Sequence, residues 1–82
     1  MIGLQFTENG SVGEMNKVFR QRLQMLREKK RISRKVLSEL CGLASDSIRR
    51  YERGEREPSM ESLVLIADFF DVSVDYLLGR EK

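Results

Sequence analysis

The stretch that decides the fold is SRKVLSELCGLASDSIRRYERG, residues 33–54. Its first residue, Ser33, is a favourable helix N-cap, because its hydroxyl can accept a hydrogen bond from a backbone N–H group of the first turn. Gly42 can adopt a left-handed backbone conformation and is therefore expected to end the helix that Ser33 begins. The apolar residues of this helix predict a buried side made of Val36, Leu37, Leu40 and Cys41.

The same stretch contains a further helix, expected from Ser45 to about Arg53 and ending at Gly54. Only residues 43–44 separate it from the preceding glycine, and so short a turn holds two helices at a steep angle, as in a helix-turn-helix unit. Ile48 and Tyr51 lie three residues apart and predict its inward face. The outward face is left to side chains that no core role explains, namely Ser45, Asp46, Arg49, Arg50 and Arg53.

Helical periodicity continues on both sides of this stretch. Asn16 is expected to cap a first helix, reaching to about residue 30, with an apolar stripe of Phe19, Leu23 and Leu26. Ser59 is expected to cap a fourth helix with the stripe Leu63, Ile66, Ala67 and Phe70, and Ser73 a short fifth one. Residues 16–82 are therefore predicted to form a compact all-α domain of five helices, with the helix-turn-helix at helices 2 and 3.

Residues 1–15 have a different pattern. Ile2, Leu4 and Phe6 alternate with other residues at strand spacing, and Asn9-Gly10 indicates a turn. The segment is predicted to be an N-terminal tail, either flexible or a short strand that needs a partner. Such a tail could bind another protein or pair with the same segment of a second copy.

The formal charge of +2 is unevenly distributed. The stretch from Lys17 to Glu57 carries +7, whereas the first sixteen residues carry −2 and the residues from Pro58 onward carry −3. This asymmetry is typical of an oriented polyanion-binding surface, and a well-solvated helical surface is the alternative explanation.

Residue types and length exclude several classes of protein. The 82 residues contain no histidine, no glycine-rich phosphate loop and no cluster of acids, so we expect no enzyme, no metal and no cofactor. No apolar run approaches the roughly 20 residues of a membrane span. The single cysteine, Cys41, is expected to be a small core residue, and the lack of any internal disulfide favours a reducing, cytoplasmic location.

Several motifs agree in order and spacing with one family. They are Leu26-Arg27-Glu28, Ile32-Ser33 leading to Leu37, Leu40 and Gly42, Ser47-Ile48, Arg50-Tyr51-Glu52-Arg53-Gly54, Pro58-Ser59 and Val72-Ser73-Val74-Asp75-Tyr76-Leu77-Leu78-Gly79. Through them, residues from about Phe19 to Gly79 resemble the Cro and phage-repressor (XRE, lambda-repressor-like) helix-turn-helix family. The resemblance implies that the helix at about residues 45–53 enters the major groove of duplex DNA.

The resemblance also implies roles for individual side chains. Arg50 is the best candidate for a bidentate contact to guanine. The base-contacting positions are Ser45, Asp46, Arg49 and Arg50. The phosphate-contacting positions are Ser33, Arg34, Lys35, Ser47 and Arg53. Arg27 and Glu52 are expected to form a structural ion pair that ties the recognition helix to the first helix, and Tyr51 is expected to pack behind the recognition helix.

The chain departs from the family's pattern at four positions. Asp46 stands where a neutral residue is frequent, and a carboxylate there could accept a hydrogen bond from cytosine or repel phosphate. Ala44 lacks a capping hydroxyl, so we expect Ser47 or Asp46 to satisfy the exposed N–H group. Arg34 stands at a position where glutamine is common in the family. Arg31 replaces a glycine, and a left-handed conformation there would cost about 1 kcal/mol.

The leading hypothesis is a sequence-specific transcriptional regulator, in particular a repressor that binds a palindromic operator as a homodimer. The dimer surface is left open between Leu65 with Phe69, which are equally expected in the core, and the strand-like tail. The alternative is an antitoxin or adaptor module of the same fold that binds a protein partner through the tail. An enzyme is the weakest hypothesis.

Overall fold

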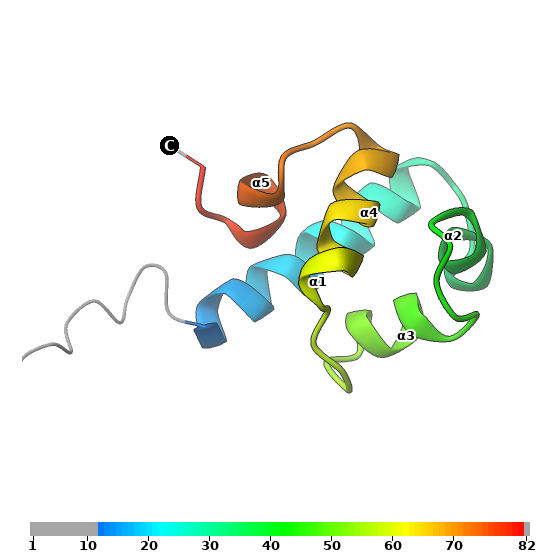
Figure 1. Cartoon of the computed structure of the whole chain (residues 1–82), viewed down its shortest axis with the longest axis horizontal. Helices are drawn as coiled ribbons and strands as arrows, with labels where there is room; N and C mark the ends of the chain where they lie inside the picture. The colour runs from blue at the N-terminus through cyan, green and yellow to red at the C-terminus, as the bar shows by residue number, and fades with distance from the viewer. Residues whose placement is uncertain (1–11, 82) are drawn as a thin grey trace, which may run out of the picture.

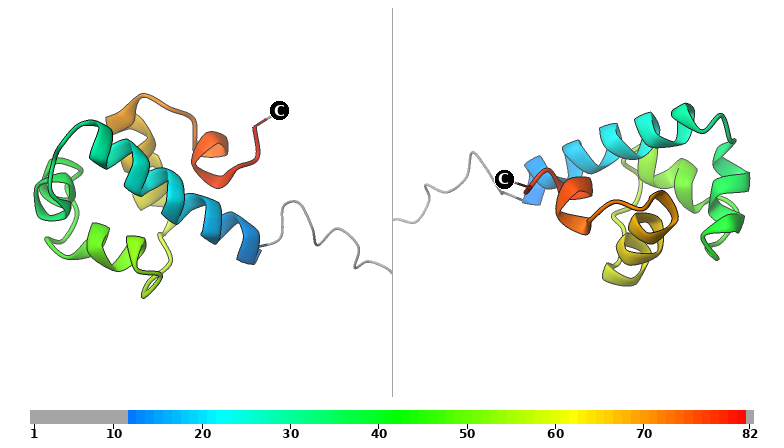
Figure 2. Two further views of the ribbon diagram at one scale, coloured as in Figure 1. Left: turned by 180° about the vertical axis from the view of Figure 1, so that it is seen from behind. Right: turned by 90° about the horizontal axis from the view of Figure 1, so that it is seen from above.

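The computed structural model describes residues 12–81, and every regular element in this range is a helix. The helices are α1 (Val12–Lys29), α2 (Arg34–Leu40), α3 (Ser47–Glu52), α4 (Met60–Phe70) and α5 (Val74–Leu78). α2 and α3 lie together at one end of the domain, and α5 lies towards the other end beside α1 (Figures 1 and 2). The predicted all-α class is confirmed. None of these helices is long and apolar enough to cross a membrane.

The three serine caps predicted from sequence are confirmed. The hydroxyls of Ser33, Ser59 and Ser73 each accept a hydrogen bond from the backbone N–H group three residues further on, at 3.1, 3.0 and 2.9 Å. Gly42 follows α2 with a φ of 76°, as expected of the residue that ends this helix. Arg31 follows α1 with a φ of 58°, so the left-handed conformation is kept at a cost of about 1 kcal/mol.

The first helix begins earlier than predicted. α1 starts at Val12, so the start expected at Asn16 is wrong. Asn16 lies inside α1 and so cannot cap its start, and its side-chain Nδ2 donates to Oε2 of Glu57 at 3.0 Å. Residues 12–15 of the predicted tail are therefore helical, and residues 1–11 of that tail lie outside the described residues.

Contacts with the C-terminal segment account for the additional turn of α1. Nη1 of Arg80 lies 3.9 Å from Sδ of Met15. Val18 contacts Gly79 so closely that a Cβ atom at Gly79 would lie 2.8 Å from Cγ1 of Val18. These contacts join residues more than 60 positions apart, which no local pattern shows, and they offset the low helix propensity of Gly13.

The buried side of α2 is narrower than predicted. Leu37 and Cys41 are buried as expected, whereas Val36 and Leu40 are 42% and 57% exposed. The fully buried neighbour of Leu37 is instead Ser38. The prediction for Val36 and Leu40 is wrong because a seven-residue helix at the end of the domain packs against α3 along one narrow face.

Ser38 explains how α3 begins without a local cap. α3 starts at Ser47, two residues later than predicted, after a turn in which the Ala44 carbonyl accepts the Ser47 N–H group at 2.9 Å. The Ser38 hydroxyl accepts the N–H group of Ile48 at 3.0 Å. Asp46, at the N-cap position, makes no side-chain capping bond. The partner expected from Ser47 or Asp46 is thus supplied by another helix.

The core is shared among all five helices. Its fully buried apolar side chains are Phe19, Leu23, Leu37, Ile48, Ile66 and Leu77. Tyr51 packs behind α3 as expected, with its ring edge-on to Phe19 at a centroid distance of 6.0 Å and its hydroxyl 3.0 Å from Oγ of Ser62. Burial raises the pKa of the Cys41 thiol, which agrees with a core role for this residue.

Candidate nucleic-acid interface

A buried carboxylate joins three helices beneath the outer surface. Glu52 on α3 accepts hydrogen bonds from Nε and Nη2 of Arg27 on α1, at 2.7 and 3.1 Å. The same carboxylate accepts a bond from Nε of Arg34 at the start of α2, at 2.9 Å. The Glu52 side chain is 2% exposed, whereas Arg27 is 11% and Arg34 46% exposed. We refer to these three residues as the Glu52 cluster.

The Glu52 cluster fixes the orientation of α3 relative to α1 and α2. The ion pair expected between Arg27 and Glu52 is formed, and it is bidentate. The hydrogen bond to Glu52 is the main reason that the pKa of Arg27 is raised above its ordinary value. Arg27 also donates through Nη1 to the Ile32 carbonyl at 3.0 Å, which ties down the turn before α2. Arg34, expected only as a phosphate contact, has a structural partner as well.

A second set of charges covers the outer face of α3. Asp46 accepts a hydrogen bond from Nε of Arg50 at 2.8 Å and lies 3.8 Å from Nη2 of Arg49. Glu55 lies 2.9 Å from Nε of Arg53 and 3.7 Å from Nη1 of Arg49. All five side chains are between 41% and 61% exposed. We refer to these five residues as the outer cluster.

The two carboxylates of the outer cluster neutralise part of a basic surface. The hydrogen bond from Arg50 is the main reason that the pKa of the Asp46 carboxyl is lowered, so the carboxylate is charged at neutral pH. Glu55 was not predicted from sequence, because it follows the helix in an irregular loop, where no periodicity assigns a face. The spacing of Glu55, two residues after Arg53, is the sequence feature that could have predicted their ion pair.

The candidate interface is a hollow between the starts of α2 and α3. Its lining residues are Arg27, Ser33, Arg34, Lys35, Ser45, Asp46 and Arg49. Six of these seven are base- or phosphate-contacting candidates from the sequence, and Arg27 belongs to the predicted ion pair. The hollow thus gathers most of the candidate residues. Of the others, Arg50 is bonded to Asp46 on the lining, whereas Ser47 and the C-cap residue Arg53 are not part of it.

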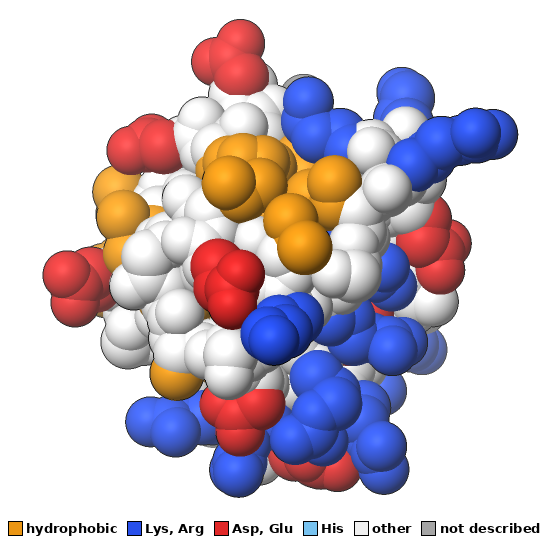
Figure 3. Space-filling model, turned by 90° about the vertical axis from the view of Figure 1, so that its right-hand side faces the viewer, with side chains coloured by type: hydrophobic (Ala, Val, Ile, Leu, Met, Phe, Trp, Pro, Cys, Tyr) orange, Lys and Arg blue, Asp and Glu red, His pale blue; other side chains and the backbone are white. Residues whose placement is uncertain are grey.

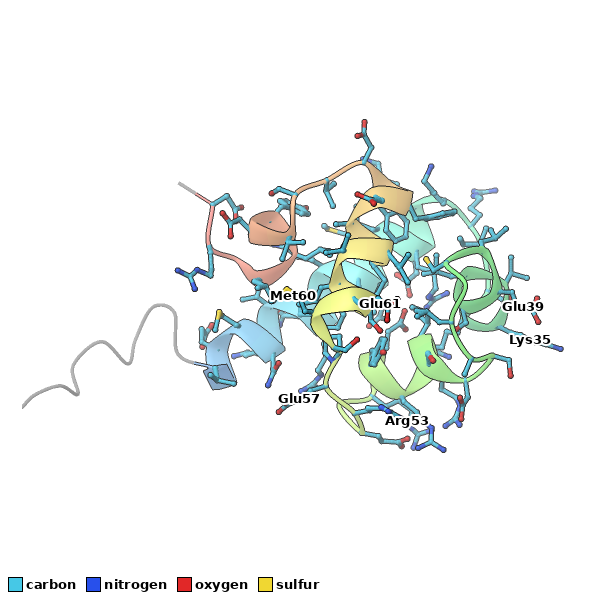
Figure 4. The ribbon with its side chains drawn as sticks, viewed as in Figure 1. Lys35, Glu39, Arg53, Glu57, Met60 and Glu61 are labelled. Carbon is cyan, nitrogen blue, oxygen red and sulfur yellow. The ribbon has the colours of Figure 1, made fainter. Side chains whose placement is uncertain are left out.

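The candidate residues differ in how exposed they are. Ser45 and Lys35 are exposed, whereas Ser47 is half-buried. Lys35 projects outward from α2, and Arg53 lies at the outer side of α3 (Figure 4). Viewed from the α2 side, basic side chains gather over the lower part of the surface, below a group of hydrophobic side chains (Figure 3). Across residues 12–81, no group of histidine, cysteine and carboxylate side chains could hold a metal ion.

This arrangement matches a known family. Residues 23–77 match the helix-turn-helix family, which is more than half of the chain. The chain therefore belongs to the helix-turn-helix family, and specifically to its Cro and phage-repressor (XRE) type, as the motifs predicted. The lambda-repressor-like fold predicted from sequence is confirmed by the solved structures that it resembles.

Among its relatives, the chain is 48% identical over 61 residues to the HTH-type transcriptional regulator AnsR of Bacillus subtilis (strain 168). That alignment covers 74% of this chain and 53% of AnsR, so the chain spans about half the length of this curated relative. The relatives are transcriptional regulators, which supports the prediction that the chain is not an enzyme.

Two solved structures share the fold. The P22 c2 repressor, crystallised with a synthetic operator, matches with a TM-score of 0.70 and 30% identity, over 77% of this chain and 96% of that one. The restriction-modification controller protein C.AhdI from Aeromonas hydrophila matches with a TM-score of 0.68 and 32% identity, over 76% and 94% of the two chains.

Proposed function

We propose that this chain is a sequence-specific regulator of transcription that binds duplex DNA with α3 in the major groove. One observation carries the proposal. The outer face of α3 bears three exposed arginines beside a hollow lined by Ser33, Arg34 and Lys35, and of these side chains only Arg34 also bonds to a buried group, Glu52. A helix and its neighbouring helix N-terminus in this arrangement fit one groove and its phosphates.

The proposed base contacts come from the start and the outer face of α3. They are Ser45, Asp46, Arg49 and Arg50. A bidentate contact of Arg50 with guanine O6 and N7 would contribute about 1–3 kcal/mol of discrimination. Within residues 12–81 the terminal nitrogens of Arg50 have no hydrogen-bond acceptor, which leaves them available for this contact.

The proposed phosphate contacts surround that face. They are Ser33, Arg34, Lys35, Ser47 and Arg53. Lys35 is exposed, and Arg53 is 61% exposed although its Nε lies 2.9 Å from Glu55. Arg34 is bonded to Glu52 through Nε, so a phosphate would engage its other nitrogens. The half-buried Ser47 is the least accessible of the set.

We further propose that the protein represses as a homodimer on a palindromic operator. A single domain of this size contributes too little surface for tight specific binding, and two half-sites one helical turn apart are the common solution. The P22 c2 repressor was crystallised with a synthetic operator, and a phage repressor of Vibrio cholerae, RstR, is 43% identical over 44 residues. Phe69 packs partly against the core, which makes it less available for a dimer surface than the half-buried Leu65.

The test is selection from a random pool of duplex DNA at about 0.15 M salt, where surface charges are realistically screened. We expect a short inverted repeat with half-site centres about ten base pairs apart. Arg50→Ala should abolish one guanine preference in each half-site. Arg80→Ala is the matched control, because it removes the same charge two residues after α5, and α5 lies away from α3 (Figure 1).

Two results would argue against the proposal. If no sequence is enriched and retention decreases steeply with salt, the basic surface binds phosphates without base recognition. The protein-partner hypothesis would then be the better one. If Arg80→Ala and Arg50→Ala have the same effect, α3 is not the recognition helix.

A further inference from the structure

Asp46 occupies the N-cap position of α3 but does not act as a cap. An aspartate at this position ordinarily accepts a hydrogen bond from an N–H group of the first turn. The Asp46 side chain forms no such bond, and Ser38 on α2 accepts the Ile48 N–H group instead. The carboxylate of Asp46 is therefore directed to other partners, which indicates a role other than starting the helix.

Those partners are the exposed arginines one turn further along α3. Oδ2 of Asp46 accepts a hydrogen bond from Nε of Arg50 at 2.8 Å, and Nη2 of Arg49 lies 3.8 Å away. Both Asp46 and Arg50 are more than 40% exposed. Exposed ion pairs of this kind contribute little to stability, so the folded state alone does not explain the pair.

The pair leaves Arg50 in a suitable state for base recognition. Because its Nε–H group is bonded to Asp46, the edge that remains is the pair of terminal nitrogens, Nη1 and Nη2. Two parallel N–H donors match the O6 and N7 acceptors of guanine. Restricting the arginine side chain before binding also lowers the entropy that is lost on binding.

The negative charge of Asp46 has a second consequence. It lies on the lining of the hollow that also contains Arg34 and Lys35, where phosphate would approach. A carboxylate there repels every phosphate equally, whereas its bond to Arg50 assists only sites with a guanine at the right position. Affinity for arbitrary DNA is lowered and affinity for the matching site is maintained.

We propose that Asp46 is a positioning residue that orients Arg50 for guanine and raises specificity by weakening non-specific binding. This inference rests on the proposed function above. It assigns to Asp46 an action through Arg50 and through its charge, in place of the direct base contact given to it in the proposed function. The family resemblance had left open whether Asp46 bonds to cytosine or simply repels phosphate.

The test compares Asp46→Asn with the unmodified full chain, on the selected operator half-site and on the same duplex with the guanine replaced by adenine. We expect the preference for guanine to decrease about tenfold, within the range for loss of a bidentate contact. Affinity for random duplex DNA should increase. The Asp46→Glu variant should retain part of the preference, because glutamate can still pair with Arg50 four residues on.

Two controls separate orientation from charge and from folding. Glu39→Gln removes the same charge from an exposed side chain on α2 that projects away from the domain (Figure 4). It should leave the guanine preference unchanged. The thermal midpoint of Asp46→Asn should remain close to that of the unmodified chain, because Asp46 makes no capping bond.

Combination with Arg50→Ala decides the mechanism. In that background, Asp46→Asn should have no further effect on base preference. A residual preference that depends on Asp46 without Arg50 would show direct base contact and overturn the inference. An unchanged guanine preference in Asp46→Asn would overturn it as well, while leaving the proposed function intact. Absence of any preferred sequence in the unmodified chain would overturn both.

Discussion

The Glu52 cluster and the outer cluster use the same chemistry for opposite purposes. Each pairs carboxylates with arginines, and α3 contributes to both. Glu52 is 2% exposed and is bonded to Arg27 and Arg34, whereas Asp46 and Glu55 are 42% and 41% exposed. Because water is excluded from the first set of bonds, these are difficult to exchange, whereas the exposed second set would be exchanged for bonds to DNA in the proposed complex. Burial, and not residue type, separates the structural ion pairs from the proposed recognition surface.

The largest effect is expected from breaking the Glu52 cluster. Glu52→Gln leaves the buried Arg27 without its carboxylate, and removing one partner of a buried pair costs about 3–5 kcal/mol. Urea unfolding followed by circular dichroism at low temperature would measure this loss. Glu55→Gln is the matched control from the outer cluster and should change stability by less than about 0.5 kcal/mol. Equal losses in the two variants would contradict the distinction between the clusters.

Replacing Ser38 would test whether the start of α3 depends on the hydroxyl that α2 supplies. Ser38→Ala leaves the buried Ile48 N–H group without an acceptor, which costs about 1–3 kcal/mol. Ser73→Ala is the matched comparison, since this exposed N-cap is expected to cost about 1 kcal/mol. Denaturant unfolding of the two variants would compare them. A smaller loss for Ser38→Ala than for Ser73→Ala would show that α3 obtains its cap elsewhere.

Arg34 combines a bond to a buried carboxylate with an exposed side chain, so it has features of both clusters. It is bonded to the buried Glu52 yet remains 46% exposed, so Arg34→Ala should reduce stability by only about 1 kcal/mol. If its terminal nitrogens also bind phosphate, the slope of log affinity against log salt should become shallower by about 0.9. Filter binding over a salt series would determine the slope. An unchanged slope would confine Arg34 to its structural role.

Glu55 should affect DNA binding more than folding. Glu55→Gln frees Arg53 and Arg49 from a carboxylate in the outer cluster, so affinity for random duplex DNA should increase at low salt. Base preference should stay the same, in contrast to Asp46→Asn. A decreased affinity would indicate that Glu55 is needed to orient Arg53. The hypothesis that Glu55 only competes with phosphate for the arginines would then be wrong.

The smallest effect concerns protonation of the outer cluster. The pKa of the Asp46 carboxyl is lowered from its ordinary value of 3.8, so the pair with Arg50 is fully formed at neutral pH. The stability that it contributes is present above the unfolded-state pKa and is lost as pH falls through the lowered folded-state value. Carboxyl NMR titration should show a midpoint below 3.8 that rises in Arg50→Ala. An unchanged midpoint would show that the pair is not maintained in solution.

Sequence alone determined the helices and most of the candidate site. Ser33, Ser59 and Ser73 were predicted as caps because capping depends on backbone groups within one turn, which sequence spacing specifies. The left-handed Gly42 and the apolar stripe of α4 follow from equally local rules. The family motifs added the pair of Arg27 with Glu52 and the positions that line the hollow.

Tertiary structure decided what local rules do not contain. Leu40 is exposed and Ser38 is buried because the packing of α2 against α3, and not hydropathy, selects the inner face. α1 begins at Val12 because residues near Gly79 pack against its first turns. Asp46 is bonded to Arg50 because Ser38, ten residues before Ile48, already supplies the cap. Each result depends on which elements meet in space, and that contact is established only when the whole chain is folded.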